Sequence, residues 1–417
     1  MKRYPKYKDS GISWLGQIPE HWEVKQLRSF LKLFSEKGHG DSQLLSVTRE
    51  QGVIQRDVES KEENHNYIPE DLSGYKYIEK GDFVINKMKA WQGSYAVSDY
   101  DGIVSPAYYT CKLSGVNSRF FTMAIRSKVY VSFFAQYSKG IRVGQWDLET
   151  EALKAIPFFF PPLNEQQKIV DFLDSKISKI NSYVLERERE LQVLTELKQS
   201  QIAQVVTKGI NPNVPMKDSG ISWIGQIPEH WSVSKISDIF KERREKVSDK
   251  DYQALSVSKQ GITLQLESAV KTDNGDNRKK VCVGDFVVNS RSDRKGSCGV
   301  SQFDGSVSLI NIVLQPREEI CGTYFHYLFR SNYYIEEFYR LGRGIVADLW
   351  TTRYSEMKNI YVPIPPKEEM EQIVHFIESK CQSIDSMISN LESEIAYLKE
   401  YKQSLIADAV TGAINVQ

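Results

Sequence analysis

Lys8-Asp9-Ser10-Gly11-Ile12-Ser13-Trp14-Leu15-Gly16-Gln17-Ile18-Pro19-Glu20-His21-Trp22 is a stretch that the chain contains twice. It returns as Lys217–Trp231, and the two copies differ only where Ile224 replaces Leu15. No compositional bias produces a repeat of this length and complexity. The sequence therefore predicts a duplicated protein with two related halves.

The sequence alignment of the two halves shows where they diverge. Gly81–Asn86 corresponds to Gly284–Asn289, and the parts that begin at Phe120 and Tyr324 keep a constant offset of 204 residues. A constant frame with variable segments is typical of a scaffold that carries different specificities. The divergent segments are residues 53–119 and 262–323.

The composition is that of a globular protein with balanced charge. The chain has 417 residues, 41% of them hydrophobic, which is enough for two or more domains with separate cores. Lys plus Arg and Asp plus Glu both number 54, so nucleic-acid binding would depend on local basic patches. No signal peptide or membrane-spanning run is evident, which predicts a cytoplasmic protein. The cysteines form no C-x-x-C pair, as expected in a reducing compartment: Cys111, Cys282, Cys298, Cys321 and Cys381.

Short β-rich runs between Gly, Asn and Asp turns predict that each half begins with an irregular β-rich domain. In the first half these runs include Leu44–Val47, Gly81–Asn86 and Tyr108–Leu113. Aromatic residues then recur at roughly helical spacing in Phe120–Tyr137 and Tyr324–Tyr339. We interpret each aromatic segment as a core helix beneath the sheet rather than as a base-stacking surface.

Two long polar helices with one apolar stripe each are the clearest periodic feature. Pro161-Pro162 and Pro365-Pro366 precede them, since proline is accepted before or within the first turn of a helix. Asn164 with Gln167 forms a candidate capping box for the first helix. The apolar stripes advance in alternating steps of three and four residues: Val170, Leu173, Ile177, Ile180, Val184, Arg187, Leu191 and Leu194, and Val374, Ile377, Cys381, Ile384, Ile388, Leu391, Ile395 and Leu398.

The two stripes match, which predicts that the helices pair as a two-helix coiled coil. Helices over about 164–208 and 368–411 would be roughly 65 Å long. Pairing within one chain is favoured because that chain supplies both stripes, and pairing between chains stays open. Arg187 is the polar position of its stripe, and it either sets the register or extends its charged end to solvent.

The expected fold class is therefore α+β. It has two pseudo-symmetric β-rich domains separated along the chain by two long helices. The expected boundaries are 1–163 for the first domain, 164–210 for the first helix, 211–366 for the second domain and 367–417 for the second helix.

No common catalytic or cofactor motif occurs in the sequence. It contains no G-x-x-x-x-G-K-[ST] phosphate loop, no H-E-x-x-H metal pair and no G-x-S-x-G nucleophile elbow. His21 and His230 are duplicates within the repeated stretch, and no His stands near a Cys at metal-ligand spacing. We therefore predict no catalytic residue and no metal site, and a structural role for each histidine.

Basic and polar residues in the loops that follow the two Gly-Asp-Phe strands are the best candidates for a binding site. Lys and Arg suit phosphates, and Arg and Gln can make paired hydrogen bonds to base edges. One such loop alone would indicate a solvated surface, but two equivalent loops with different residues favour recognition. The candidate contacts are Lys87, Lys89, Trp91 and Gln92 in the first loop, Ser290, Arg291, Arg294 and Lys295 in the second, Arg278, Lys279 and Lys280 before the second strand, and Arg142, Gln145 and Arg343 on another pair of matched loops.

Over nearly its whole length the sequence resembles the DNA specificity (S) subunits of type I restriction-modification systems. The resemblance rests on the repeated K-D-S-G-I-x-W-[LI]-G-x-I-P-x-H-W stretch, the Gly-Asp-Phe-Val strand, the two helices and Pro-Pro-x-x-Glu-Gln at Pro161–Gln166. The second copy departs from the last motif, because Met370 takes the place of its Gln.

The resemblance implies two target recognition domains, each reading one half of a split, asymmetric site in double-stranded DNA. The two helices would form an antiparallel coiled coil that holds the domains apart as a spacer. It implies a noncatalytic scaffold without membrane contact that binds two modification (methyltransferase) subunits and restriction (translocase/nuclease) subunits. S-adenosylmethionine, ATP and Mg²⁺ would belong to those partners, and this chain would hold no cofactor. Two alternatives stay open: a DNA-modifying enzyme with an unrecognised active site, and a coiled-coil protein adaptor.

The repeated stretch and its second copy carry four tryptophans, for which two roles are considered. Near-identity of the copies argues against base contact, since elements that read different half-sites should differ. The tryptophans either anchor the stretch against neighbouring helix ends, which we favour, or form docking surfaces for two copies of one partner. They are Trp14, Trp22, Trp223 and Trp231.

Overall fold

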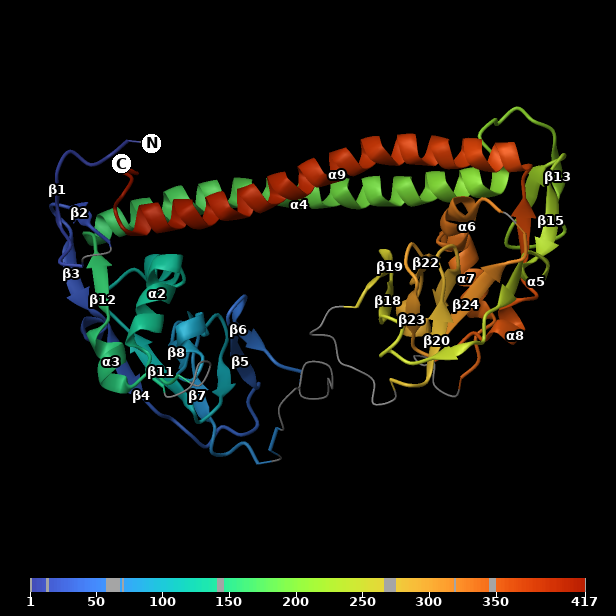
Figure 1. Cartoon of the computed structure of the whole chain (residues 1–417). Helices are drawn as coiled ribbons and strands as arrows, with labels where there is room; N and C mark the ends of the chain where they lie inside the picture. The colour runs from blue at the N-terminus through green and yellow to red at the C-terminus, as the bar shows by residue number, and fades with distance from the viewer. Residues whose placement is uncertain are drawn as a thin grey trace. The chain divides into compact units, whose positions relative to one another are not determined.

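The chain forms two compact units, each with one β-rich domain and parts of two long helices. Unit 1 comprises Met1–Arg187 and Ser393–Gln417, and unit 2 comprises Glu188–Glu392. Helix α4 (Leu163–Lys208) and helix α9 (Lys367–Val410) each contribute one part to both units (Figure 1). The structure, a computed structural model, describes residues 2–12, 15–57, 68–69, 71–140, 146–265, 275–318, 320–344 and 350–416.

The domain of unit 1 is built around a four-stranded antiparallel sheet of order β4-β11-β8-β9. Paired strands and short helices surround this sheet. In chain order the elements are β1 Tyr7–Asp9, β2 Gln17–Pro19, β3 Glu23–Gln26, η1 Leu27–Ser29, β4 Leu31–Phe34, β5 Leu45–Thr48, β6 Gly52–Gln55, β7 Lys76–Ile78, β8 Phe83–Asn86, η2 Ala90–Gln92, β9 Tyr95–Val97, β10 Gly102–Val104, β11 Tyr108–Leu113, α1 Ser118–Ile125, α2 Lys128–Tyr137, α3 Thr150–Ala155 and β12 Pro157–Phe160.

The domain of unit 2 repeats this plan around a sheet of order β16-β24-β21-β22. Its elements are β13 Met216–Asp218, β14 Gln226–Pro228, β15 Ser232–Lys235, α5 Ile236–Ile239, β16 Phe240–Glu242, β17 Lys246–Val247, β18 Leu255–Ser258, β19 Gly261–Leu264, β20 Arg278–Val281, β21 Phe286–Asn289, η3 Ser292–Arg294, β22 Cys298–Val300, β23 Gly305–Val307, β24 Asn311–Pro316, α6 Gly322–Phe329, α7 Asn332–Arg340, α8 Tyr354–Met357 and β25 Tyr361–Ile364.

The central strand β8 is buried on both faces, which explains its continuous apolar sequence. Successive side chains of a strand point to opposite faces of the sheet. Phe83 and Ile85 therefore join the main core with the helices, whereas Val84 joins a second cluster with hairpin β5–β6. In unit 2 Phe286 and Val287 divide in the same way.

The Gly-Asp pair before this strand makes the turn that starts it. Gly81 has a φ of +97°, which disfavours residues with a side chain. The buried carboxylate of Asp82 accepts a hydrogen bond from Lys112 Nζ at 3.0 Å. In unit 2 Arg243 binds Asp285 through two hydrogen bonds of 2.7 and 3.0 Å. A cation from the neighbouring part of the sheet thus compensates each buried carboxylate.

The aromatic segments form the core, as predicted, but each consists of two short helices rather than one. Helix α1 ends at Ile125, and α2 begins at Lys128. In unit 2 the break falls at Ser331, whose side chain accepts a hydrogen bond from the backbone N–H of Tyr334 and so begins α7. Most of the phenylalanines and tyrosines of these helices are buried.

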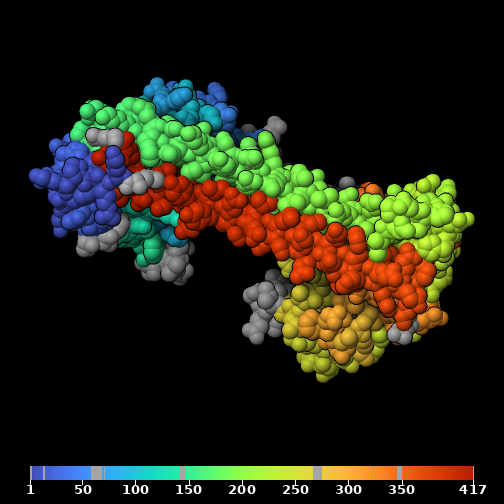
Figure 2. All heavy atoms as spheres, turned by 90° about the horizontal axis from the view of Figure 1, so that it is seen from above, coloured from blue at the N-terminus to red at the C-terminus, as the bar shows by residue number. Residues whose placement is uncertain are grey.

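Helices α4 and α9 lie side by side in each unit, which confirms the predicted intramolecular pairing (Figure 2). In unit 1 Leu173 of α4 shares a core with Leu405 of α9, and in unit 2 Val206 shares one with Ile377. The helices are therefore antiparallel. Within the described part of the chain, no helix is both long enough and apolar enough to cross a bilayer.

Two details at the helices differ from or refine the expectations. Asn164 does not cap α4, because the helix already begins at Leu163 and the carbonyl of Pro162 accepts the first backbone hydrogen bonds.

Arg187 lies between the helices, where its Nε is 3.6 Å from Oε1 of Glu394 on α9. This contact favours a role in helix register over simple extension into solvent.

Candidate nucleic-acid interface

In unit 1 the β8–β9 loop (residues 87–94) meets the segment between α2 and α3. The backbone N–H of Leu148 donates to the carbonyl of Lys87 at 3.1 Å, and Lys139 pairs with Asp147 as an isolated β-bridge. The Lys87 ammonium lies 3.0 Å from Asp147, and their hydrogen bond raises the pKa of Lys87. The β8–β9 loop is therefore joined, through Asp147 and Leu148, to the described end of the second predicted loop.

In unit 2 the β21–β22 loop (residues 290–297) is held in the same way. The backbone N–H of Thr352 donates to the carbonyl of Ser290 at 3.0 Å, which is the counterpart of the bond between Leu148 and Lys87. Thr351 forms isolated bridges with both Arg291 and Arg343, so these two arginines flank one extended segment. Both units thus present equivalent loops on equivalent backbone supports.

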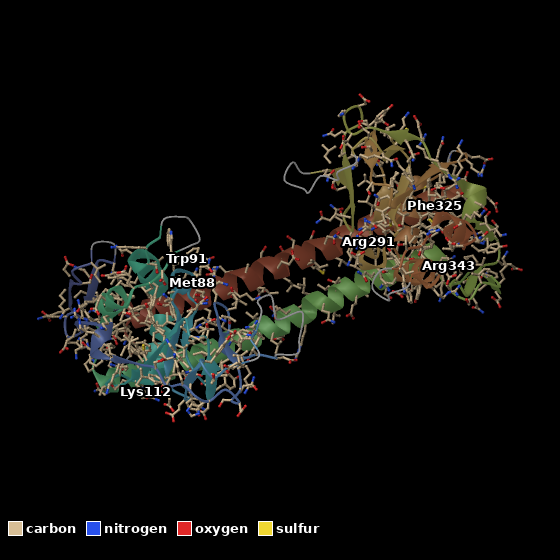
Figure 3. The ribbon with its side chains drawn as sticks, turned by 90° about the horizontal axis from the view of Figure 1, so that it is seen from below. Met88, Trp91, Lys112, Arg291, Phe325 and Arg343 are labelled. Atoms are coloured by element: carbon tan, nitrogen blue, oxygen red, sulfur yellow. The ribbon has the colours of Figure 1, made fainter. Side chains whose placement is uncertain are left out.

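Different side chains occupy these equivalent loops. In unit 1 the side chains of Met88 (59% exposed) and Lys89 are exposed, and Trp91 packs against Trp146 with ring centroids 5.2 Å apart. Figure 3 marks Met88 and Trp91 in unit 1, and Arg291 and Arg343 in unit 2. The surface of unit 1 therefore combines an apolar and an aromatic side chain with lysines at this place.

The unit 2 surface is richer in arginine, but most of its cations have acidic partners. Both carboxylate oxygens of Asp293 accept hydrogen bonds from Arg291, each at 2.9 Å, and Arg294 Nε lies 3.7 Å from the same carboxylate. Lys295 lies 3.1 Å from Glu336. Arg343 has an 84% exposed side chain, 4.0 Å from Glu356. The net positive charge of the surface is accordingly smaller than the sequence indicates.

The structure does not support four of the predicted DNA contacts, because their side chains serve the fold. Arg278 is 5% exposed, and its guanidinium donates to the hydroxyl and the carbonyl of Ser306. Ser290 is buried and donates to the carbonyl of Ile310. Lys279 and Lys280 pair with glutamates of the adjacent strand and loop, at 3.3 and 2.9 Å. Nucleic acid could reach the buried Arg278 and Ser290 only if their internal bonds broke. The side chains of Lys279 and Lys280 are only 16% and 23% exposed.

Three other predicted residues, Trp14, Arg142 and Gln145, lie outside the described residues. Trp223 is half-buried and packs edge-on against Tyr334, with ring centroids 5.9 Å apart. Trp22 and Trp231 are fully buried, so the prediction that they dock a partner is wrong. Their anchoring role, which the sequence favoured, accounts for both.

The anchor of each repeated stretch is a glutamate in the first turn of a long helix. In unit 1 Glu165 of α4 accepts hydrogen bonds from Tyr4 Oη at 2.6 Å and Trp22 Nε1 at 3.1 Å. His21 Nε2 lies 2.7 Å from the same carboxylate. In unit 2 Glu369 accepts from Trp231 at 2.9 Å. This glutamate belongs to the Pro-Pro-x-x-Glu motif, which explains why the motif accompanies the repeated stretch.

The sequence-based selection left out two residues of the candidate surface, Met88 and Asp293. The offset of 203 residues between the two Gly-Asp-Phe strands aligns Met88 with Arg291 and Ala90 with Asp293. This alignment was available from the sequence, and it marks two positions at which an apolar residue in one loop corresponds to a charged residue in the other.

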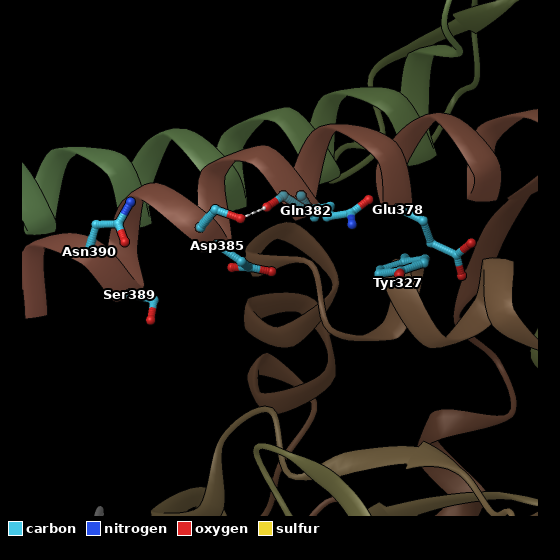
Figure 4. Close-up of a pocket in the computed structure, with 8 residues that line it drawn as sticks. Tyr327, Glu378, Gln382, Asp385, Ser389 and Asn390 are labelled. Carbon is cyan, nitrogen blue, oxygen red and sulfur yellow. Dashed lines mark hydrogen bonds between the residues drawn. The ribbon is translucent and has the colours of Figure 1, made fainter. Parts of the chain in front are cut away.

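A groove elsewhere in unit 2 is less suited to nucleic acid. A shallow groove of about 650 Å³ lies where Tyr327 of α6 faces α9, and its lining includes Glu378 and Asp385 (Figure 4). Carboxylates at such a groove repel phosphates. Among the described residues no group of three or more His, Cys, Asp or Glu side chains is arranged to hold a metal ion.

Comparison with known families identifies the repeated unit. The family described as "Type I restriction modification DNA specificity domain" matches residues 19–192 and 228–396. This chain belongs to that family. The two matches to the DNA specificity domain fall on the two halves that the repeated stretch predicted, and they confirm the expected fold class.

Individual relatives of this DNA specificity protein agree with the assignment. It is 23% identical to the type I restriction enzyme MjaVIII specificity subunit of Methanocaldococcus jannaschii, over 96% of this chain and 95% of that protein. It is 24% identical to the type I restriction enzyme EcoBI specificity subunit of Escherichia coli, over 72% of this chain and 66% of the relative. A solved structure concerned with complex assembly and conformational transition of the type I restriction-modification system matches its fold with a TM-score of 0.66, at 15% identity, over 95% of this chain and 99% of the other.

Proposed function

We propose that this chain reads a bipartite, asymmetric site in double-stranded DNA as the specificity and scaffold subunit of a type I restriction-modification enzyme. Each β-rich domain would read one half-site. The observation that carries the proposal is the pair of loops that share backbone support but differ in side chains. Shared support with different chemistry is what two readers of different sequences require.

The proposed contacts fall into two groups by chemistry. Lys87, Lys89 and Arg343 are cations suited to phosphates, and position the domain without reading sequence. Base-edge contacts are assigned to polar and arginine side chains, which can donate paired hydrogen bonds. These are Gln92, Arg291, Arg294 and Lys295, with Trp91 as an apolar neighbour. Arg142 and Gln145 stay predictions of the same kind.

The proposed partners are two modification (methyltransferase) subunits and restriction (translocase/nuclease) subunits. Two equivalent repeated stretches suit two copies of one partner, because equivalent surfaces bind equivalent molecules. The accessible part of Trp223, and Trp14 in the first copy, stay candidates for this contact. S-adenosylmethionine, ATP and Mg²⁺ are assigned to the partner subunits, and the complex is expected in the cytoplasm. We also propose that the first domain ends at residue 163, the first spacer helix at residue 210 and the second domain at residue 366.

Mapping methylated bases in DNA treated with a reconstituted complex tests the proposal. The full chain with its modification subunits is expected to methylate one two-part sequence with a fixed unread spacer. Methylation without sequence preference would contradict it. As a control, the isolated chain with S-adenosylmethionine and Mg²⁺ is expected to leave DNA unmodified, since modification is assigned to its partners.

A further inference from the structure

We propose that Arg291 reads a guanine in the half-site of the second domain, and that Asp293 is the positioning residue that holds its guanidinium for this contact. The inference rests on the proposed function and adds to it a specific base and a specific pair of residues. Two observations support it: the ion pair between these residues, and the hydrogen-bonded backbone of the loop that carries them.

The ion pair leaves the guanine-reading edge of Arg291 available. A guanidinium has five N–H donors in a rigid planar fork. Asp293 accepts from Nε and Nη2, at 2.9 Å each, so it occupies the side of the group. Nη1 forms no hydrogen bond with any residue that the structure describes. The end of the group, formed by Nη1 and the second proton of Nη2, matches the O6 and N7 acceptors of guanine.

The backbone around Arg291 is fixed from three directions. Its own N–H donates to Oδ1 of Asn289 at 3.1 Å, and it bridges to Thr351. On the next residue, Ser292, the N–H donates to the carbonyl of Trp350 at 2.9 Å. A side chain held at both its backbone and its guanidinium loses little conformational entropy on binding, which is the requirement for selective base reading.

The charge of the pair argues for a base contact rather than a phosphate contact. Arg291 and Asp293 pair at 2.9 Å and together are neutral, while Arg294 lies further from the same carboxylate, at 3.7 Å. A phosphate near Arg291 would therefore also meet the carboxylate of Asp293. Phosphate contacts draw their affinity from net positive charge and counterion release. Hydrogen bonds to a base edge depend on donor geometry, which Asp293 improves. Asp293 therefore weakens a contact between Arg291 and a phosphate but supports a contact between Arg291 and a base edge.

The first domain provides an internal comparison. At the positions equivalent to Arg291 and Asp293 it has Met88 and Ala90. Met88 is exposed and the Arg291 side chain is 43% exposed, whereas Ala90 is buried. An acid thus occurs at this place only in the loop that carries the arginine. This is expected if Asp293 positions Arg291 and if the turn itself does not require an acid.

Two substitutions in the complete complex with its modification subunits test the proposal. Arg291→Lys keeps the charge but removes the planar fork, and Asp293→Asn keeps the shape but removes the negative charge. Methylation rates would be measured on duplexes carrying each of the four bases at every half-site position. Wild-type complex is expected to prefer guanine at one position of the second half-site by about 10- to 150-fold, and Arg291→Lys to reduce that preference to a few fold at that position alone.

Asp293→Asn separates positioning from simple charge removal. It is expected to weaken the guanine preference while increasing the salt dependence of DNA binding by about one counterion, because Arg291 then carries net charge. If Asp293→Asn strengthened DNA binding equally on all sequences and left the guanine preference unchanged, the proposed role of Asp293 would be overturned. Unchanged preference for the first half-site and an unchanged melting temperature serve as controls for folding.

The outcomes also separate this inference from the proposed function. A wild-type complex that methylates a bipartite site, together with an Arg291→Lys complex of identical base preference, would overturn the inference alone. A position that relaxes in Arg291→Lys but prefers a base other than guanine would overturn it as well. A wild-type complex without preference in either half-site would overturn both.

Discussion

Glu165 is the residue on which the anchoring of the first repeated stretch depends. Its carboxylate is 3% exposed and lies within hydrogen-bond distance of Tyr4, His21 and Trp22. Burial and the nearby carboxylate raise the pKa of Tyr4, which strengthens the preference of its hydroxyl for the protonated, donating form. Glu369 has the same place in unit 2, but its side chain is 24% exposed and has two such neighbours, His230 and Trp231.

Glu165→Ala is therefore expected to lower the free energy of unfolding of unit 1 by about 2–4 kcal/mol, since it leaves buried donors without an acceptor. The matched change Glu369→Ala should cost less, because water can reach that site. Urea unfolding followed by tryptophan fluorescence measures both. A larger loss for Glu369→Ala would contradict this account of the anchors.

His326 gives unit 2 a pH dependence that unit 1 lacks, because Thr122 stands at the equivalent position. Burial, aided by Arg330, lowers the pKa of His326 to about 4. An unfolded histidine has a pKa of about 6.5, so between about pH 6.5 and pH 4 the unfolded chain binds a proton that the folded chain does not. The free energy of unfolding of unit 2 should therefore fall as the pH falls through this range.

His326→Thr is expected to remove this part of the pH dependence, which amounts to at most ~3 kcal/mol between pH 7 and pH 4. Unfolding curves at pH 7.5, 6 and 5 give the measurement, and Thr122→Ser in unit 1 is the control. An acid sensitivity that survives the substitution unchanged would assign it to other groups.

At the scale of elements, the ends of the long helices are equivalent but not equally crowded. Gly412 follows α9 with a φ of +76°, and a Cβ there would come within 2.3 Å of Pro19. Gly209 follows α4 with a φ of +78°, and its nearest atoms would be 3.3 Å away, on Glu369 and Trp231. Each glycine ends its helix in the left-handed region.

Gly209→Ala should thus cost about 1 kcal/mol, the usual penalty for a left-handed alanine, whereas Gly412→Ala should cost about 2–3 kcal/mol, because a rigid proline ring must also move. Thermal unfolding of the two variants measures the difference. Equal losses would mean that Pro19 moves aside without cost.

The elements with regular periods were predictable from the sequence, and the partners of charged side chains were not. The apolar stripes of α4 and α9 were predictable because apolar residues recur every three or four positions within each helix. Arg278 looked like part of a basic run, but it is buried because Ser306, 28 residues further along, accepts its hydrogen bonds. Lys295 meets Glu336 across an even longer separation. Such contacts depend on the fold, and no local pattern indicates them.

At the scale of the whole molecule, the variable segments lie in separate units. Residues 53–119 contain the β8–β9 loop of unit 1, and residues 262–323 contain the β21–β22 loop of unit 2. Replacing residues 53–119 by the corresponding segment of another specificity subunit is expected to change one half-site of the methylated sequence. Exchange of residues 262–323 is the reciprocal control. Changes in both halves after a single exchange would contradict the modular arrangement.

The ion pairs within the loops also bear on how the protein searches a genome. Random DNA attracts a protein chiefly through net positive charge, and a genome offers about a million or more competing sites. Because Asp147, Asp293 and Glu336 already neutralise neighbouring cations, the free surface should hold random DNA weakly. Selectivity can then arise from short residence at wrong sites as much as from tight binding at the right one. These three acids would shorten the search by releasing the protein from sequences it does not recognise.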